Sequence, residues 1–163
     1  MQKKITTFLT FDGRAEEAVD FYTSIFENSK ILSTTRYEAE GPGPKGELMS
    51  ATFELAGEEF VALNGGPSFT FSQGISLYVD CADQEEVDEL WAKLTEEGDP
   101  GPCGWLTDRF GVFWQIIPRT LGELLADEDR EKAGRVMQAM LQMSKIDVEE
   151  LRRAYEGAEA SLP

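Results

Sequence analysis

Residues 7–26 read TFLTFDGRAEEAVDFYTSIF, and residues 75–94 read ISLYVDCADQEEVDELWAKL. Both stretches open with the β-branched, aromatic and aliphatic residues of a strand, and these strands are expected over residues 5–11 and 75–79. Apolar residues three and four positions apart then predict an amphipathic helix in each. A shift of 68 residues superimposes the core positions: Leu9 on Leu77, Phe11 on Val79, Val19 on Val87, Tyr22 on Leu90 and Phe26 on Leu94. The chain therefore repeats one strand–helix unit.

Further strands are predicted after each strand–helix unit. Turn residues and apolar alternation place them over residues 30–36, 48–55 and 60–64 in the first half, and around Trp105 and over residues 112–117 in the second. Two copies of the order β-α-β-β-β predict an α+β fold of two modules, in which each mixed sheet carries a helix on one face and curls around a cavity with the other. We expect the modules over about residues 1–66 and 73–119, within one domain over residues 1–119.

The rest of the chain, residues 120–163, predicts a C-terminal helical extension. Helices are expected over residues 120–126, over residues 128–143 and, after an N-cap at Asp147, to residue 154. A methionine-rich apolar stripe that includes Met137 and Met140 follows the middle helix. We interpret this stripe as core packing, and the alternative is a pliable surface that seals a dimer.

The charge of the chain restricts its partners. The chain has 163 residues, of which 31 are acidic and 15 are basic, and its formal net charge is −16. This charge repels phosphate backbones and anionic lipids, so neither nucleic acid nor a membrane surface is an expected partner. The first residues do not resemble a signal peptide, and no apolar stretch is long enough to span a bilayer, which predicts a cytoplasmic protein.

Missing residue types exclude several kinds of site. The sequence contains no histidine, which excludes histidine general bases, Ser-His and Cys-His nucleophile pairs, and imidazole metal ligands. Its two cysteines, Cys81 and Cys103, form no CxxC pair, so neither a disulfide framework nor a thiolate zinc site is indicated. Any chemistry must use carboxylate, amide, hydroxyl, phenol, thiol or amine groups.

Alternation along the strands predicts which side chains face the helices and which face the cavities. The side chains expected on the helix side are Leu9, Phe11, Val61, Leu63, Ile75, Leu77, Val79, Trp114 and Ile116. Those expected on the cavity side are Thr6, Phe8, Thr10, Phe60, Ala62, Asn64, Ser76, Tyr78, Phe113, Gln115 and Ile117. Ligand contacts are expected from the second set.

Four stretches carry a family resemblance: TFDGRAEEAVDFY at residues 10–22, FVALNGGP at 60–67, CGWLTDRFGVFWQIIP at 103–118 and RVMQAMLQM at 135–143. They resemble the PhnB-like branch of the vicinal-oxygen-chelate superfamily, to which glyoxalases, bleomycin-resistance proteins and dioxygenases belong. Members of this branch are often labelled 3-demethylubiquinone-9 3-methyltransferase. The resemblance covers nearly the whole chain, and it implies a glyoxalase-like fold of paired βαβββ modules and a homodimer.

The resemblance also implies where a metal ion would lie. Enzymes of the superfamily hold it with side chains from the first and last strands of each module, mostly histidine and glutamate, and these positions fall here on Thr6, Ala62, Gly74 and Gln115. Only Gln115 has a donor atom suited to a metal, so we expect no metal site and no glyoxalase or dioxygenase chemistry. No glycine-rich turn leads from a strand into a helix, so we expect no adenosylmethionine and no other cofactor.

Seven residues are candidates for ligand binding: Thr6, Phe8, Asn64, Ser76, Tyr78, Trp105 and Gln115. The aromatic side chains of Phe8, Tyr78 and Trp105 suit a planar or apolar ligand. The amides of Asn64 and Gln115 both donate and accept hydrogen bonds, which suits a ligand with a carbonyl group.

Two residues near Trp105 are candidates for catalysis, namely the Cys103 thiol and the Asp108 carboxylate. A reactive thiol needs a nearby cation, and Arg109 or Arg119 would supply it. The alternative interpretation of Cys103 is a half-buried structural cysteine.

Three functions are compatible with these residues. We predict a metal-independent small-molecule-binding protein with an apolar or aromatic ligand. The first alternative is an isomerase-type, lyase-type or methyltransferase-like enzyme that acts on a small metabolite. The second alternative is a structural protein whose methionine-rich tail mediates dimerisation. All three stay open at the level of the sequence.

Overall fold

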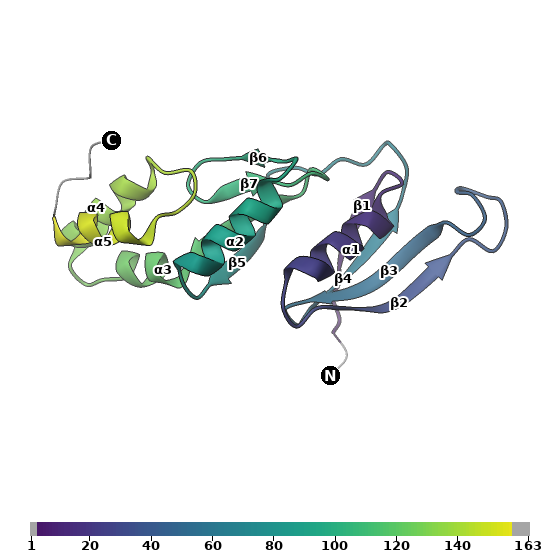
Figure 1. The fold of residues 1–163 in the computed structure, drawn as a ribbon, viewed down its shortest axis with the longest axis horizontal. Coiled ribbons are helices and arrows are strands. Elements are labelled where there is room, and N and C mark those ends of the chain that lie inside the picture. Colours follow the sequence, from purple (N-terminus) through teal and green to yellow (C-terminus); the bar gives the residue numbers. More distant parts are fainter. Residues whose placement is uncertain (1–2, 158–163) are drawn as a thin grey trace. The chain divides into compact units, whose positions relative to one another are not determined.

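The computed structural model describes residues 3–157, and the chain divides between Thr70 and Phe71 into two compact units. Unit 1 contains the first strand–helix repeat, and unit 2 contains the second repeat and the C-terminal helices. Each unit is built on a four-stranded sheet. Figure 1 shows one helix across one face of each sheet, α1 in unit 1 and α2 in unit 2. The predicted α+β duplication is therefore confirmed.

Unit 1 follows the predicted β-α-β-β-β order. Its elements are β1 (Thr7–Phe11), α1 (Ala15–Ile25), β2 (Lys30–Arg36), β3 (Leu48–Leu55) and β4 (Glu58–Asn64). The strands lie in the order β1-β4-β3-β2, where β1 is parallel to β4 and the other neighbours are antiparallel. The predicted hairpin between β3 and β4 turns at Ala56 and Gly57, whose positive φ angles of 50° and 85° are those of a tight two-residue turn.

The core of unit 1 lies between α1 and the inner face of its sheet. Four helix residues are buried there because they share one helical face: Ala15, Ala18, Val19 and Tyr22. The buried strand residues are Leu9, Phe11, Leu48, Ala51, Phe53, Leu55, Phe60 and Ala62. The rings of Phe53 and Phe60 stack with their centroids 5.6 Å apart.

The predicted faces of β4 are wrong. β1 pairs with β4 so that Leu9 lies opposite Ala62, and both residues are buried. The helix side of β4 is therefore formed by Phe60, Ala62 and Asn64, and its open side by Val61 and Leu63. Hydrophobicity favoured the opposite assignment because Val61 and Leu63 are bulkier than Ala62. A one-residue change of phase moves every side chain of a strand to the other face.

Unit 2 repeats the strand–helix order and adds three helices. Its elements are β5 (Leu77–Cys81), α2 (Gln84–Thr95), β6 (Asp99–Pro100), β7 (Trp105–Thr107), β8 (Phe113–Pro118), α3 (Arg119–Leu125), α4 (Arg130–Met140) and α5 (Val148–Glu156). The strands lie in the order β5-β8-β7-β6, with β5 parallel to β8. The sequence did not predict β6, which has only two residues. Ile75 was expected on the helix side of a strand, but it precedes β5 and is 79% exposed.

Aspartate caps determine where three helices of unit 2 begin. The predicted capping box opens α2, because Glu86 N–H donates to Asp83 Oδ1 at 3.0 Å while Ala82 N–H donates to Glu86 Oε2 at 2.9 Å. The predicted cap Asp147 accepts from the third N–H of α5 at 3.1 Å. Asp129 caps α4 in the same way.

The C-terminal helices enclose a second core in unit 2. Ile117, at the end of β8, is buried together with Leu121, Val136, Ile146 and Leu151. Met140 packs against this core, as predicted for the methionine stripe, whereas Met137 is exposed. None of the helices within residues 3–157 has the length and apolar character needed to cross a membrane.

The helix α4 ends at Met140, three residues before the predicted end. The chain leaves the helix because residues 143 and 144 pair with the segment that precedes β7. The N–H groups of Cys103 and Gly104 donate to the carbonyl oxygens of Met143 and Ser144, both at 2.8 Å. These two bonds attach the extension to the sheet of unit 2.

Candidate functional site

Three predicted ligand-binding residues form a row across the sheet of unit 2. Tyr78 on β5 is paired with Gln115 on β8, and Gln115 is paired with Trp105 on β7. The neighbours of Gln115 along β8, Trp114 and Ile116, are buried. Since successive side chains of a strand alternate between faces, the row lies on the face opposite α2. We call this row, together with Ser76, the second-sheet site.

The Gln115 amide lies at the centre of the second-sheet site. Its Nε2 donates to Ser76 Oγ at 2.9 Å, which orients the amide group. No other residue in the described part of the chain bonds to this amide, so its carbonyl oxygen and second N–H are available. The Tyr78 side chain is 58% exposed and Trp105 is half-buried. The site therefore offers aromatic surface beside a group that donates and accepts.

An ion pair borders the second-sheet site. Asp80 is two residues beyond Tyr78, and its carboxylate accepts from Arg119 Nε at 3.2 Å and from Nη2 at 3.1 Å. The pKa of Tyr78 is raised, mainly by partial burial and further by electrostatic interaction with Asp80 and then Cys81. The phenol is therefore a neutral hydrogen-bonding group at neutral pH.

The open face of the first sheet carries no counterpart of the amide. The repeat places Thr10 at the position of Tyr78, and Thr10 is paired with Leu63. Leu63, rather than Ala62, is therefore the counterpart of Gln115. Phe8 lies on this face and is 58% exposed, and Thr6 precedes β1. Besides Phe8, Val61 and Leu63, this face carries the hydroxyl groups of Thr10, Ser50 and Thr52, and none of these residues is an amide.

Asn64 serves the core of unit 1. Its Oδ1 accepts from the N–H of Ala15, the first residue of α1, at 3.0 Å, and its Nδ2 donates to the Leu48 carbonyl at 2.9 Å. The side chain thus joins α1 to β3 and β4, which supplies α1 with the cap that Arg14 does not provide. Both polar atoms of Asn64 have protein partners on the helix side of the sheet.

The two catalytic candidates lie at opposite ends of β7. Cys103 lies in the turn before the strand and Asp108 follows it, and the four residues between them include the whole extended strand. Arg109 pairs with Glu97 at 3.0 Å, and Arg119 pairs with Asp80. The structure therefore does not bring the thiol and the carboxylate together.

The Asp108 carboxylate is directed into the protein. The residue is 4% exposed, and its Oδ1 accepts from the N–H groups of Phe110 and Val112 at 2.9 and 3.0 Å. Its Oδ2 accepts from the Trp114 indole N–H at 2.8 Å. The carboxylate holds the turn before β8 against the core, and this arrangement is structural.

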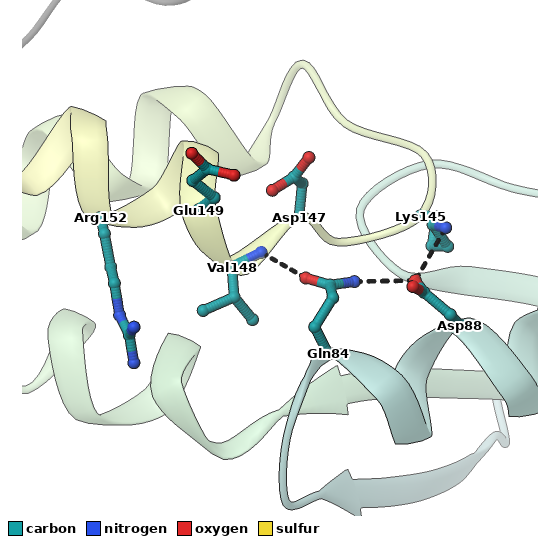
Figure 2. A pocket seen from close by; sticks show the side chains of 7 residues that line it. All are labelled: Gln84, Asp88, Lys145, Asp147, Val148, Glu149 and Arg152. Atoms are coloured by element: carbon teal, nitrogen blue, oxygen red, sulfur yellow. Dashed lines mark hydrogen bonds and ion pairs between the residues drawn. The ribbon is translucent and has the colours of Figure 1, made fainter.

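A polar pocket of about 510 Å³ lies where the C-terminal extension meets α2 (Figure 2). Its lining residues are Gln84, Asp88, Lys145, Asp147, Val148, Glu149 and Arg152. Gln84 Oε1 accepts from the Val148 N–H at 2.7 Å, and Gln84 Nε2 donates to Asp88 at 2.9 Å and to the Ile146 carbonyl at 3.0 Å. This contact was not predicted from the sequence, where its only signal was the polar pair Gln84 and Asp88, one helical turn apart.

The residues at the superfamily's metal positions do not fit a metal ion. Because Leu63, and not Ala62, lies on the open face of β4, the four metal positions are occupied by Thr6, Leu63, Gly74 and Gln115. Leu63 and Gly74 have no side-chain donor atom, so only the Thr6 hydroxyl and the Gln115 carbonyl oxygen could contribute, whereas a divalent ion wants several carboxylate or imidazole ligands. Residues 3–157 also hold no group of three acidic, histidine or cysteine residues that could bind a metal.

Comparison with known proteins agrees with this fold. A family model described as 3-demethylubiquinone-9 3-methyltransferase matches residues 3–117. The chain belongs to this family. A PhnB protein of known structure from Bacillus cereus, provisionally described as a 3-demethylubiquinone-9 3-methyltransferase, is 43% identical over 71% of this chain and 99% of its own, with a TM-score of 0.66.

Two more distant structures share the fold of this family member. A protein from Pseudomonas aeruginosa is 21% identical over 72% of this chain and 98% of its own, with a TM-score of 0.58. The fosfomycin resistance protein FosX from Listeria monocytogenes is 16% identical over 76% of this chain and 98% of its own, with a TM-score of 0.52. The glyoxalase-like fold and the PhnB-like resemblance are confirmed. No curated protein matches the chain.

The residues also do not fit adenosylmethionine, which the family's description implies. Doubly wound α/β folds bind such a cofactor at a glycine-rich turn that leads from a strand into the uncovered N-terminus of the next helix. Here the N-terminus of α1 is bonded to Asn64, and that of α2 is capped by Asp83. The helix N-termini that follow β1 and β5 are thus both occupied by protein groups.

Proposed function

We propose that the protein binds a small planar molecule at the second-sheet site without a metal ion. The observation that carries the proposal is the row in which Tyr78 and Trp105 flank the amide of Gln115 on paired strands. Ligand sites are mostly apolar and aromatic, with a few oriented polar groups that give specificity. The row supplies both kinds of group on one face.

Binding is favoured over catalysis by where the reactive groups lie. The Asp108 carboxylate is enclosed by three hydrogen-bond donors, and Cys103 is separated from it by β7. Neither residue has the base–nucleophile geometry that a thiol or carboxylate mechanism needs. The groups of the second-sheet site offer stacking on the aromatic rings and hydrogen bonding by the amide and the hydroxyl groups.

A thermal-shift screen of planar compounds against the full chain tests this proposal, with a chelator present throughout. Compounds that raise the melting temperature are then titrated into Gln115→Ala and into Gln138→Ala, a control in α4. We expect Gln115→Ala to weaken binding about fivefold to tenfold, as for loss of one hydrogen bond of about 1–1.4 kcal/mol. The control should bind as the parent does.

Titration with divalent ions tests the metal-independent part of the proposal. Calorimetry with Mn²⁺, Ni²⁺ and Zn²⁺ should give no stoichiometric binding that depends on Gln115. A tight one-to-one metal complex that is lost in Gln115→Ala would overturn the proposal. Compounds that bind equally well to the parent and to Gln115→Ala would move the ligand site elsewhere.

A further inference from the structure

The spacing of the second-sheet site suits one aromatic ring. Neighbouring strands lie about 4.8 Å apart, so the backbones of Tyr78 and Trp105, one strand to each side of Gln115, are about 10 Å apart. A ring in contact with aromatic atoms on both sides needs about 3.5–4 Å to each. One planar ring therefore fits between the two side chains, above the amide.

The charges near this site favour a cation. The four residues of the second-sheet site carry no charge at neutral pH, since burial and nearby negative charges raise the pKa of the Tyr78 phenol. Arg119, which follows β8, is held by two hydrogen bonds from its guanidinium to Asp80. The faces of tyrosine and tryptophan rings attract cations. A net charge of −16 also concentrates cations and depletes anions near the surface.

We infer that the second-sheet site binds planar aromatic cations and discriminates against anions that carry the same ring. The inference rests on the proposed function and adds the charge of the ligand. A delocalised ring cation, of the pyridinium or acridinium class, would stack between Tyr78 and Trp105. Where the cation carries an N–H group on its edge, the Gln115 carbonyl oxygen would accept from it. A carboxylate or phosphate would find no free basic partner among the four residues of the site.

Three probes with one ring system test the inference on the full chain. They are N-methylacridinium, acridine at pH 8 and acridine-9-carboxylate, and binding is measured by probe fluorescence in roughly 0.15 M salt to limit long-range attraction. We expect the cation to bind about tenfold more tightly than neutral acridine, in line with cation–π contacts, and the anion to bind more weakly still.

Matched variants separate the site from the surface. Trp105→Leu and Tyr78→Leu should each weaken N-methylacridinium binding at least about fivefold and reduce the preference for the cation. Trp105→Phe, which keeps an aromatic face, should retain most of the binding. Tyr37→Leu is the control, since it removes an aromatic ring of unit 1 outside the site. Far-UV circular dichroism checks that each variant is folded.

The possible results distinguish this inference from the proposed function. Equal affinity for the three probes, with loss of all binding in Trp105→Leu, would overturn the preference for cations and leave the proposed site standing. Binding that Trp105→Leu and Tyr78→Leu leave unchanged would overturn both. Both would also be overturned if roughly 0.5 M salt abolished cation binding in the parent and in every variant, since such binding would be general attraction to an acidic surface. A change of oligomeric state in Tyr78→Leu would instead assign the face to an interface between copies.

Discussion

Replacement of Asp108 should destabilise unit 2 by several kcal/mol. The carboxylate accepts from two backbone N–H groups and from the Trp114 indole, in a site that is 4% exposed. Each buried donor left without an acceptor costs about 1–3 kcal/mol. The three bonds share one carboxylate and water can enter the gap, so we expect about 3–5 kcal/mol in total for Asp108→Ala. This is a large part of the stability of an ordinary domain.

The isosteric variant Asp108→Asn isolates the indole contact. Its carbonyl oxygen can keep the two backbone bonds, but its NH₂ group then faces the indole N–H, and we expect a loss of about 1–3 kcal/mol. Asp108→Asn should be less damaging in a Trp114→Phe background, where the opposing donor is gone. Urea unfolding followed by circular dichroism gives both free energies. A loss below about 1 kcal/mol for Asp108→Ala, combined with loss of ligand binding, would refute the structural role and restore Asp108 as a site carboxylate.

Four further predictions follow from other contacts. Asn64→Ala should lower the free energy of unfolding by about 1–2 kcal/mol because α1 loses its cap. Asn64→Asp keeps the acceptor oxygen and should lose less, so equal losses in the two variants would contradict a capping role for Asn64. Gln84→Ala should speed amide hydrogen exchange in α5, whereas the exposed control Gln138→Ala should not. Burial raises the pKa of the Cys81 thiol from an ordinary 9.0 to about 12. The folded protein therefore holds the thiol proton more tightly than the unfolded chain does, and this contribution to stability is complete below pH 9.0 and lost as the pH rises toward about 12. The urea midpoint should fall over that range, and Cys81→Ala should remove this part of the fall. The homodimer that the family resemblance implies should give twice the chain mass of 18.2 kDa in light scattering, and the single mass would contradict it.

Much of the fold was predictable because its helices and longer strands are strongly periodic. Val19 of α1 and Val87 of α2, which the 68-residue shift superimposes, are both fully buried, as expected. The phase of β4 was not predictable, since its larger apolar residues face outward and the small Ala62 lies beneath α1. Only the pairing with β1 decides that phase. The strand β6 is too short for any alternation to show.

The candidate site was predictable where the phase of the strands was unambiguous. Alternation along β5 and β8 placed Tyr78 and Gln115 on one face, but only strand pairing shows that Trp105 completes the row. The role of Asp108 could not be predicted, because the direction of a turn side chain depends on the tertiary contact with Trp114. Asn64 was assigned to ligand binding through the same error of phase that affected β4.

The most direct test of a metal-free ligand site on the second sheet is a nuclear magnetic resonance titration. The full chain, labelled with ¹⁵N and kept in excess chelator, is titrated with N-methylacridinium while the Trp105 indole N–H and the Gln115 side-chain NH₂ signals are followed. We predict that these signals shift together and saturate at one ligand per chain, while the Trp114 indole N–H, buried against Asp108, moves little. Signals of Trp105 and Gln115 that stay in place at saturation, or that shift only when a divalent ion replaces the chelator, would contradict the account.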